Sequence, residues 1–181
     1  MKRLALVAAL LALPALAAEL EGVKVEDSIK VGDKTLVLNG QGLRVKIFFK
    51  VYVASMWLES KSNDGAAILG ADTTRRVQMT MLRDVTKSQL EESIRAGMEK
   101  NYNGDVSKLK ERLDKMMATF AEVKKGASLT ITYEPGKGTT VEGGSTKFSA
   151  EGKDFADALF GCFIGKNPAT EDLKKGMLGG K

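Results

Sequence analysis

The stretch that decides the fold is residues 38–59, which read LNGQGLRVKIFFKVYVASMWLE. It is rich in β-branched and aromatic residues, and this composition predicts two strands, at residues 43–48 and 50–59. Gly40 and Gly42 come just before them and permit a tight bend. One arginine, Arg44, and one tyrosine, Tyr52, lie inside this strand-forming run. Such an arrangement can offer a polar anchor within an apolar cavity.

The spacing of Arg44 and Tyr52 decides whether they can act together. They are eight residues apart, and a continuous strand at ~3.3 Å per residue would separate them by roughly 26 Å. They converge only if the chain bends or pairs between them. In the alternative interpretation, Arg44 bonds a nearby acidic residue such as Glu59 or Asp84, and Tyr52 packs at a sheet edge.

The N-terminus has the order of a secretory signal peptide. Lys2 and Arg3 precede an apolar run at residues 4–15, and small residues follow at positions suited to cleavage near Ala17 or Ala18. A membrane-spanning helix would need about 20 apolar residues, and this run is shorter. We therefore expect a signal peptide at residues 1–18 and a single soluble, monomeric domain at residues 19–181, without a membrane anchor.

The amino-acid composition excludes several kinds of catalytic and metal-binding site. The chain contains no histidine, which excludes serine–histidine and cysteine–histidine catalysis and the usual zinc sites. Its one cysteine, Cys162, lies in an apolar segment and is expected to be a buried thiol. Basic residues at 108–115 alternate with acidic ones, which is typical of a solvated helix face and not of a nucleic-acid interface. The sequence indicates no metal and no cofactor.

The remaining pattern predicts an α+β domain with a mostly antiparallel sheet. Short strands are expected at residues 23–25, 29–31 and 35–38, a short helix at 66–69, and further strands at 76–82 and 146–150. Thr86 begins a capping-box helix that runs to about Asn101, and Asp105 caps a second helix with an apolar stripe. A hairpin follows at residues 129–142, then a helix at 154–164 and a short C-terminal helix after Thr170.

Three segments together resemble the chalcone isomerase-like superfamily, and more narrowly its bacterial, exported branch. They are the run from Gly42 to Ala54, the hairpin from Tyr133 to Thr139, and the ending from Phe155 to Pro168. The resemblance covers about residues 20–178. It implies an open-faced β-sandwich, in which helices pack on one face of a large antiparallel sheet and a ligand cleft lies between them. The predicted signal peptide implies a periplasmic or secreted protein.

The resemblance also assigns roles to individual positions. Arg44 matches the arginine that lines the cleft, and Tyr52 matches a position that is threonine in the isomerases and tyrosine in the fatty-acid binders. Leu90 and Gly97 occupy the positions of the isomerases' helical tyrosine and asparagine. Cys162 replaces a hydroxyl residue. The leucine side chain donates no hydrogen bond and glycine has no side chain, so the pattern favours a non-catalytic protein.

The leading hypothesis is a binder of a fatty acid or similar amphiphilic carboxylate, with Arg44 and Tyr52 as the anchor. An isomerase or related lyase is one alternative, for which Tyr102, Tyr133 and Lys50 are the loose acid–base candidates. The other is a structural or partner-binding envelope protein, which would show an exposed apolar patch. Residues that can form either the cleft wall or the core are Phe48, Met56, Met79, Met81, Leu90, Ile94 and Met98.

Overall fold

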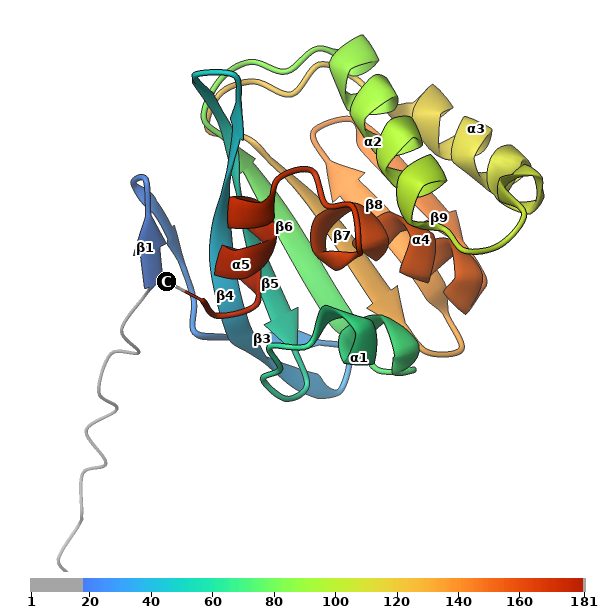
Figure 1. Ribbon diagram of the computed structural model, residues 1–181, viewed down its shortest axis with the longest axis horizontal. Coiled ribbons are helices and arrows are strands. Elements are labelled where there is room, and N and C mark those ends of the chain that lie inside the picture. Colours follow the sequence, from blue (N-terminus) through green and yellow to red (C-terminus); the bar gives the residue numbers. More distant parts are fainter. Residues whose placement is uncertain (1–17, 181) are drawn as a thin grey trace, which may run out of the picture.

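A computed structural model describes residues 18–180. Seven strands form one antiparallel sheet in the order β3-β4-β5-β6-β7-β8-β9, so each strand pairs with its sequence neighbours, and β1 and β2 form a separate ribbon (Figure 1). The predicted signal peptide lies outside the described residues except for Ala18, the first residue of β1. The strands are β1 (Ala18–Leu20), β2 (Val23–Val25), β3 (Ser28–Val31), β4 (Lys34–Lys46), β5 (Phe49–Leu58), β6 (Arg75–Met81), β7 (Ser128–Glu134), β8 (Gly138–Gly143) and β9 (Thr146–Ala150).

The helices pack against one face of this sheet (Figure 1). They are α1 (Gly65–Gly70), α2 (Lys87–Asn101), the 3-10 helix η1 (Val106–Leu109), α3 (Lys110–Thr119), α4 (Lys153–Ile164) and α5 (Glu171–Met177). The predicted α+β class, with a large antiparallel sheet and helices on one face, is confirmed. Among residues 18–180, no helix combines the length and apolarity needed to cross a membrane.

Helix α2 forms one wall over the sheet, and its start is fixed by local sequence. Thr86 Oγ1 accepts a hydrogen bond from Gln89 N, and Gln89 Oε1 accepts one from Thr86 N, which is the predicted capping box. Leu90, Ile94 and Met98 follow at helical spacing and are buried. Asp105 also acts as a cap, but it caps the 3-10 helix η1, and the α-helical part begins only at Lys110.

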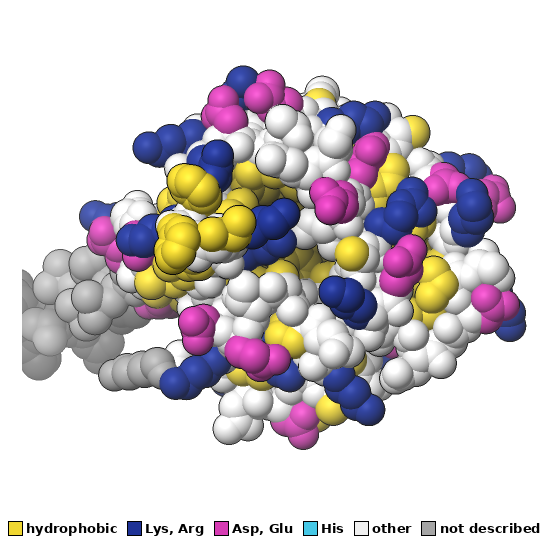
Figure 2. Space-filling view, turned by 45° about the horizontal axis from the view of Figure 1, so that its top comes forward, with side chains coloured by type: hydrophobic (Ala, Val, Ile, Leu, Met, Phe, Trp, Pro, Cys, Tyr) yellow, Lys and Arg dark blue, Asp and Glu magenta, His cyan; other side chains and the backbone are white. Residues whose placement is uncertain are grey.

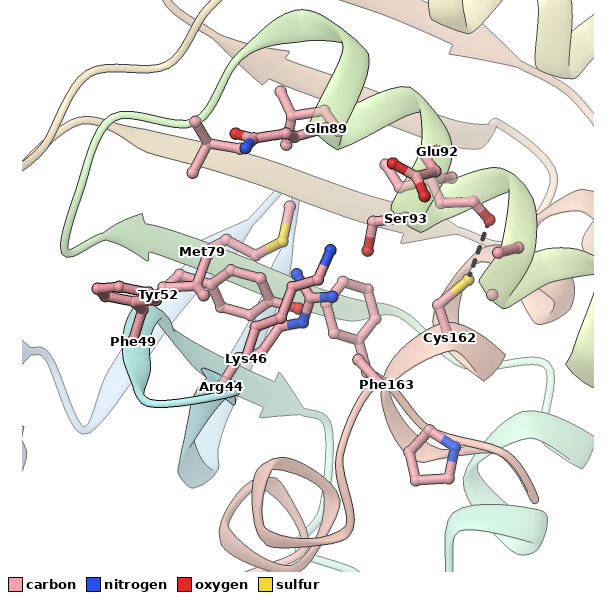
Figure 3. A pocket seen from close by; sticks show the side chains of 18 of the residues that line it. Arg44, Lys46, Phe49, Tyr52, Met79, Gln89, Glu92, Ser93, Cys162 and Phe163 are labelled. Carbon is pink, nitrogen blue, oxygen red and sulfur yellow. Dashed lines mark hydrogen bonds between the residues drawn. The ribbon is translucent and has the colours of Figure 1, made fainter.

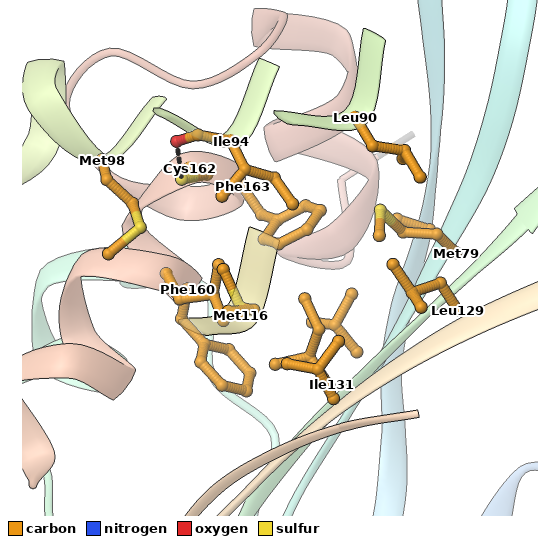
Figure 4. Packing of buried hydrophobic residues seen from close by; sticks show 14 of the residues in the cluster. Met79, Leu90, Ile94, Met98, Met116, Leu129, Ile131, Phe160, Cys162 and Phe163 are labelled. Carbon is orange, nitrogen blue, oxygen red and sulfur yellow. Dashed lines mark hydrogen bonds between the residues drawn. The ribbon is translucent and has the colours of Figure 1, made fainter. Parts of the chain in front are cut away.

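The core has two parts, one on each face of the sheet. The larger lies between the sheet and the helices, where residues such as Met116, Ile131 and Phe160 interdigitate (Figure 4). The smaller surrounds Trp57 on the opposite face, beside the β1–β2 ribbon. Trp57 Nε1 donates to the carbonyl oxygen of Glu26 at 2.9 Å, so its polar group is satisfied although the ring is buried.

Strand β4 corrects the expectation of a bend at Gly40 and Gly42. The chain stays extended through both, and the register shift beside them leaves Asn39 as the extra residue of a bulge. A Cβ at Gly42 would collide with the backbone oxygen of Leu173, and one at Gly40 would collide with that of Gly176. The two glycines therefore let α5 lie directly on the sheet.

Arg75 is fully buried, and most of its guanidinium nitrogens donate hydrogen bonds to other protein groups. Its Nη2 donates to Asp157 Oδ1 at 2.5 Å, and its Nη1 donates to two backbone carbonyls at the end of α1. The guanidinium lies between the rings of Tyr133 and Phe160, 4.8 and 4.9 Å from their centroids. Its Nε alone lacks a partner among residues 18–180. Arg75 therefore ties the sheet to α1 and α4.

Candidate functional site

The β4–β5 hairpin brings Arg44 and Tyr52 together. The chain reverses at Ile47 and Phe48, and Arg44 pairs directly with Tyr52 across the two strands. The Arg44 Cζ atom lies 5.6 Å from the centroid of the Tyr52 ring. The two residues are therefore neighbours, because strand pairing removes the separation that a continuous strand would impose.

Both side chains line a cavity of about 430 Å³ between the sheet and the helices. Its walls come from the upper ends of β4, β5 and β6, from α2, from the end of α4 and from the segment that follows α4. Figure 3 shows Arg44 and Lys46 extending from β4 towards α2, where Ser93 points back at them. Figure 2 shows the opening of the cavity as a hollow on the surface, with hydrophobic side chains inside it and basic side chains beside it. The volume lies in the range of small-molecule sites.

The Arg44 guanidinium has no protein counter-ion among residues 18–180. Its Nε is buried without a hydrogen-bond partner, and it takes part in no ion pair there. Glu59 instead accepts from Thr74 N at 2.8 Å and pairs with Lys34, while Asp84 pairs with Lys124. The alternative in which Glu59 or Asp84 binds Arg44 is therefore not what the structure shows.

Tyr52 and Cys162 are the buried titratable groups of this cavity. Burial raises the pKa of Tyr52 to about 12, although the nearby Arg44 charge opposes that shift. Tyr52 lies on β5, inside the sheet and not at its edge. Burial also raises the pKa of the Cys162 thiol to about 12, so it stays protonated and is not a nucleophile at neutral pH. The prediction of a buried thiol at Cys162 is confirmed.

The mouth of the cavity is basic. Besides Arg44, the lining contains Lys46, Arg83 and Lys100, which take part in no ion pair among residues 18–180, and only two acidic side chains. One of these, Asp84, accepts hydrogen bonds from the backbone N–H of Lys125 and from Lys124 Nζ, and these bonds lower its pKa. The local field therefore favours an anionic group at the cavity mouth.

The predicted wall residues divide into three groups. Met79, Leu90 and Ile94 line the cavity. Met56, Met81 and Met98 are buried in the core and do not line it. The expectation for Phe48 was wrong, because this side chain is 90% exposed at the hairpin turn and belongs to neither the wall nor the core.

Several lining residues were not predicted from the sequence. Lys46 follows Arg44 at strand period two and so shares its face, and Ser93 follows Leu90 by three positions on α2. The acid–base candidates of the isomerase alternative do not line the cavity. Tyr133 donates from its hydroxyl to Asp72 Oδ1 at 2.6 Å, and Lys50 pairs with Glu21 at 2.7 Å on the surface.

Gly97 has a packing role at the cavity wall. A Cβ at this position would lie 2.7 Å from Cys162 Sγ, closer than real Cβ atoms approach other groups. The absence of a side chain therefore lets α2 and α4 meet at Cys162. Gly97, Leu90 and Cys162 all line the cavity.

The geometry defines an α+β protein with a ligand-sized cavity between its sheet and its helices, and comparison with known proteins places it in a family. A family model described as chalcone isomerase-like matches residues 17–179, and the chain belongs to this family. A crystal structure of a fatty-acid binding protein from Arabidopsis thaliana has the same fold, with a TM-score of 0.65 and 15% sequence identity over 87% of this chain and 92% of that one. No curated protein matches the chain.

Proposed function

We propose that this protein is an exported, non-catalytic member of its family that binds a fatty acid or a similar amphiphilic carboxylate. The observation that carries the proposal is the Arg44 guanidinium, which lines the cavity beside apolar residues such as Met79 and Leu90 and has no acidic partner among residues 18–180. Arginine offers a planar fork of donors that matches a carboxylate. An anionic ligand would supply the counter-charge that the protein itself does not.

Tyr52 provides the second half of the anchor. Its pKa of about 12 keeps the phenol protonated at neutral pH, so it can donate a hydrogen bond to a carboxylate oxygen beside Arg44. The ligand's tail would lie along Met79, Leu90 and Phe163, where each buried methylene contributes about 0.8 kcal/mol. Affinity then comes mainly from the tail, and orientation from the head group.

The comparisons support the same class of ligand. The structural neighbour from Arabidopsis thaliana is named as a fatty-acid binding protein and shares the fold. Leu90 and Gly97 line the cavity, and the resemblance implies that the isomerases carry tyrosine and asparagine at these positions. Gly97 has no room for a side chain without movement of Cys162. An isomerase reaction would appear as loss of chalcone absorbance with the purified protein, and such activity would contradict the non-catalytic assignment.

Export is part of the proposal and has its own test. The N-terminal charge, apolar run and small residues favour cleavage near Ala17 or Ala18. Expression of the full chain in a bacterium, followed by fractionation and N-terminal sequencing, should give periplasmic or secreted protein that begins close to those residues. Uncleaved protein in the cytoplasm would contradict export.

The binding proposal is tested by identifying what the protein carries. Purified mature protein is extracted with organic solvent, and the extract is analysed by mass spectrometry alongside Arg44→Met and the control Arg95→Met. Arg95 is a matched control because it lies on α2, pairs with Asp114 on the surface and does not line the cavity. We expect a bound carboxylate in wild type and in Arg95→Met that is lost in Arg44→Met. If all three emerge empty and none gains thermal stability with added fatty acid, the proposal is wrong.

A further inference from the structure

The tip of the β4–β5 hairpin, residues 44–50, exposes apolar side chains to solvent. Ile47, Phe48 and Phe49 are 76%, 90% and 58% exposed, and Val45 lies beside them. These four are the exposed large hydrophobic residues among residues 18–180. Figure 2 shows hydrophobic side chains gathered on a protruding part of the face that carries the hollow. Clustered exposure of this kind marks an interaction surface.

The same tip is basic. Its sequence is RVKIFFK, which interleaves three basic residues with four apolar ones and contains no acidic residue. Arg83 adds a fourth positive charge, because its guanidinium lies 4.8 Å from the centroid of the Phe49 ring. Lys50 is paired with Glu21, but neither Lys46 nor Arg83 has an acidic partner among residues 18–180. The surface partner is therefore expected to be anionic as well as apolar.

The backbone conformation of the hairpin turn does not favour the isoleucine that occupies it. Ile47 is the first of the two loop residues and has φ of 62°. Two-residue hairpin loops normally place glycine or asparagine where φ is positive, and β-branched residues rarely adopt this conformation. An isoleucine held there, with its side chain in solvent, points to a role outside the folded core.

The tip is continuous with the cavity. Lys46, Ile47 and Phe49 line the cavity mouth, while Phe48 is at the outer end of the turn and does not line it. A surface that covers the tip would therefore lie against the entrance through which a ligand reaches Arg44. This continuity distinguishes the tip from an apolar patch elsewhere on the molecule.

We propose that the hairpin tip docks this protein onto the surface of an anionic lipid bilayer. Ile47 and Phe48 would enter the boundary between head groups and acyl chains, and Lys46 and Arg83 would contact the anionic head groups. Lysines flank the apolar residues on both sides, an arrangement that suits anionic head groups around inserted apolar side chains. Docking does not require the proposed ligand, but transfer of a fatty acid between bilayer and cavity would rest on that proposed function.

The test uses co-sedimentation of the mature protein with vesicles of phosphatidylcholine alone or with added phosphatidylglycerol. We expect binding to the anionic vesicles only, weakened by salt. Phe48→Ser should lower the partition coefficient about tenfold, and Lys46→Gln about fivefold. Lys147→Gln is the matched control, because Lys147 is exposed on β9, at the opposite edge of the sheet, and should leave binding unchanged.

The outcomes separate docking from ligand binding and from self-association. Phe48 does not line the cavity, so Phe48→Ser should keep its affinity for fatty acid in solution and its melting temperature. A Phe48→Trp variant should show a blue shift of its added indole with anionic vesicles, while the buried Trp57 gives a constant background. Three results would each overturn the proposal: wild type does not bind vesicles, wild type and Phe48→Ser bind them equally, or wild type forms a concentration-dependent dimer that Phe48→Ser abolishes.

Discussion

Replacement of Arg44 by methionine is expected to stabilise the ligand-free protein, whereas the same replacement at Arg75 is expected to destabilise it. Both arginines lie in strands of the same sheet and face the helices. Arg75 donates to Asp157 and to two carbonyls from a fully buried position. The Nε atoms of both arginines are buried without a partner, but the Arg44 side chain, unlike that of Arg75, makes no hydrogen bond or ion pair among residues 18–180. The proposed function predicts this contrast between a structural arginine and a ligand-binding one.

The magnitudes follow from these contacts. An unsatisfied buried polar group costs about 1–3 kcal/mol, and because Arg44 is only partly buried we expect Arg44→Met to raise the free energy of unfolding by about 1 kcal/mol. Loss of one partner of a buried ion pair costs about 3–5 kcal/mol. Asp157 would keep Lys153 at 2.6 Å and is 31% exposed, so Arg75→Met should lower the free energy of unfolding by about 3 kcal/mol.

The assay is urea unfolding of delipidated, refolded protein, followed by circular dichroism and by Trp57 fluorescence to check that one transition describes both probes. The two variants should shift the midpoint in opposite directions, with an unchanged slope. If Arg44→Met destabilises the ligand-free protein as much as Arg75→Met does, then Arg44 is a structural residue and the argument for a ligand anchor fails.

Three further changes test other parts of the structure. Ile47→Asn should raise the free energy of unfolding by about 1 kcal/mol, because asparagine tolerates the positive φ at this position better than isoleucine. The same change should weaken vesicle binding. Unchanged stability in thermal unfolding would contradict the presence of backbone strain at Ile47. Gly42→Ala should cost about 1–3 kcal/mol through collision with α5, whereas Gly70→Ala, with no atom within 4 Å, should be nearly neutral in the same assay. Burial raises the pKa of Cys162 from 9.0 to about 12 on folding, so the thiol contributes on the order of 4 kcal/mol to the free energy of unfolding below pH 9, and this contribution is lost as the pH rises to 12. The urea midpoint of Cys162→Ala should therefore fall less than that of wild type between pH 9 and about 12. Parallel plots of midpoint against pH for the two proteins would refute the pKa shift.

The sequence predicts most of the secondary structure because its signals are local. The capping box at Thr86 and the alternation in β7 and β9 depend on residues a few positions apart, and the structure has these elements where the pattern predicts them. The glycines of β4 were misinterpreted because their reason is distant. Gly42 is required by contact with Leu173, and no local pattern distinguishes that use of glycine from a bend.

The site was predictable in part. The resemblance identified Arg44 and Tyr52, and the structure makes them direct strand partners on one cavity, although the sequence could not fix the turn between them. The turn at Ile47 and Phe48 lacks the glycine or asparagine that signals a hairpin. Phe48 was misplaced because an aromatic residue in an apolar run is usually buried, whereas this one falls in the hairpin turn and is exposed.

The central claim is that Arg44 holds the carboxylate of an amphiphilic ligand. The most direct measurement compares the affinity of wild type and Arg44→Met for a fatty acid and for its methyl ester, which has the same tail but no charge. Wild type should bind the acid about 10- to 100-fold more tightly than the ester, because charge-assisted hydrogen bonds contribute about 1.5–3 kcal/mol. Arg44→Met should bind both equally. Equal affinities in wild type, or an unchanged preference in Arg44→Met, would contradict the claim.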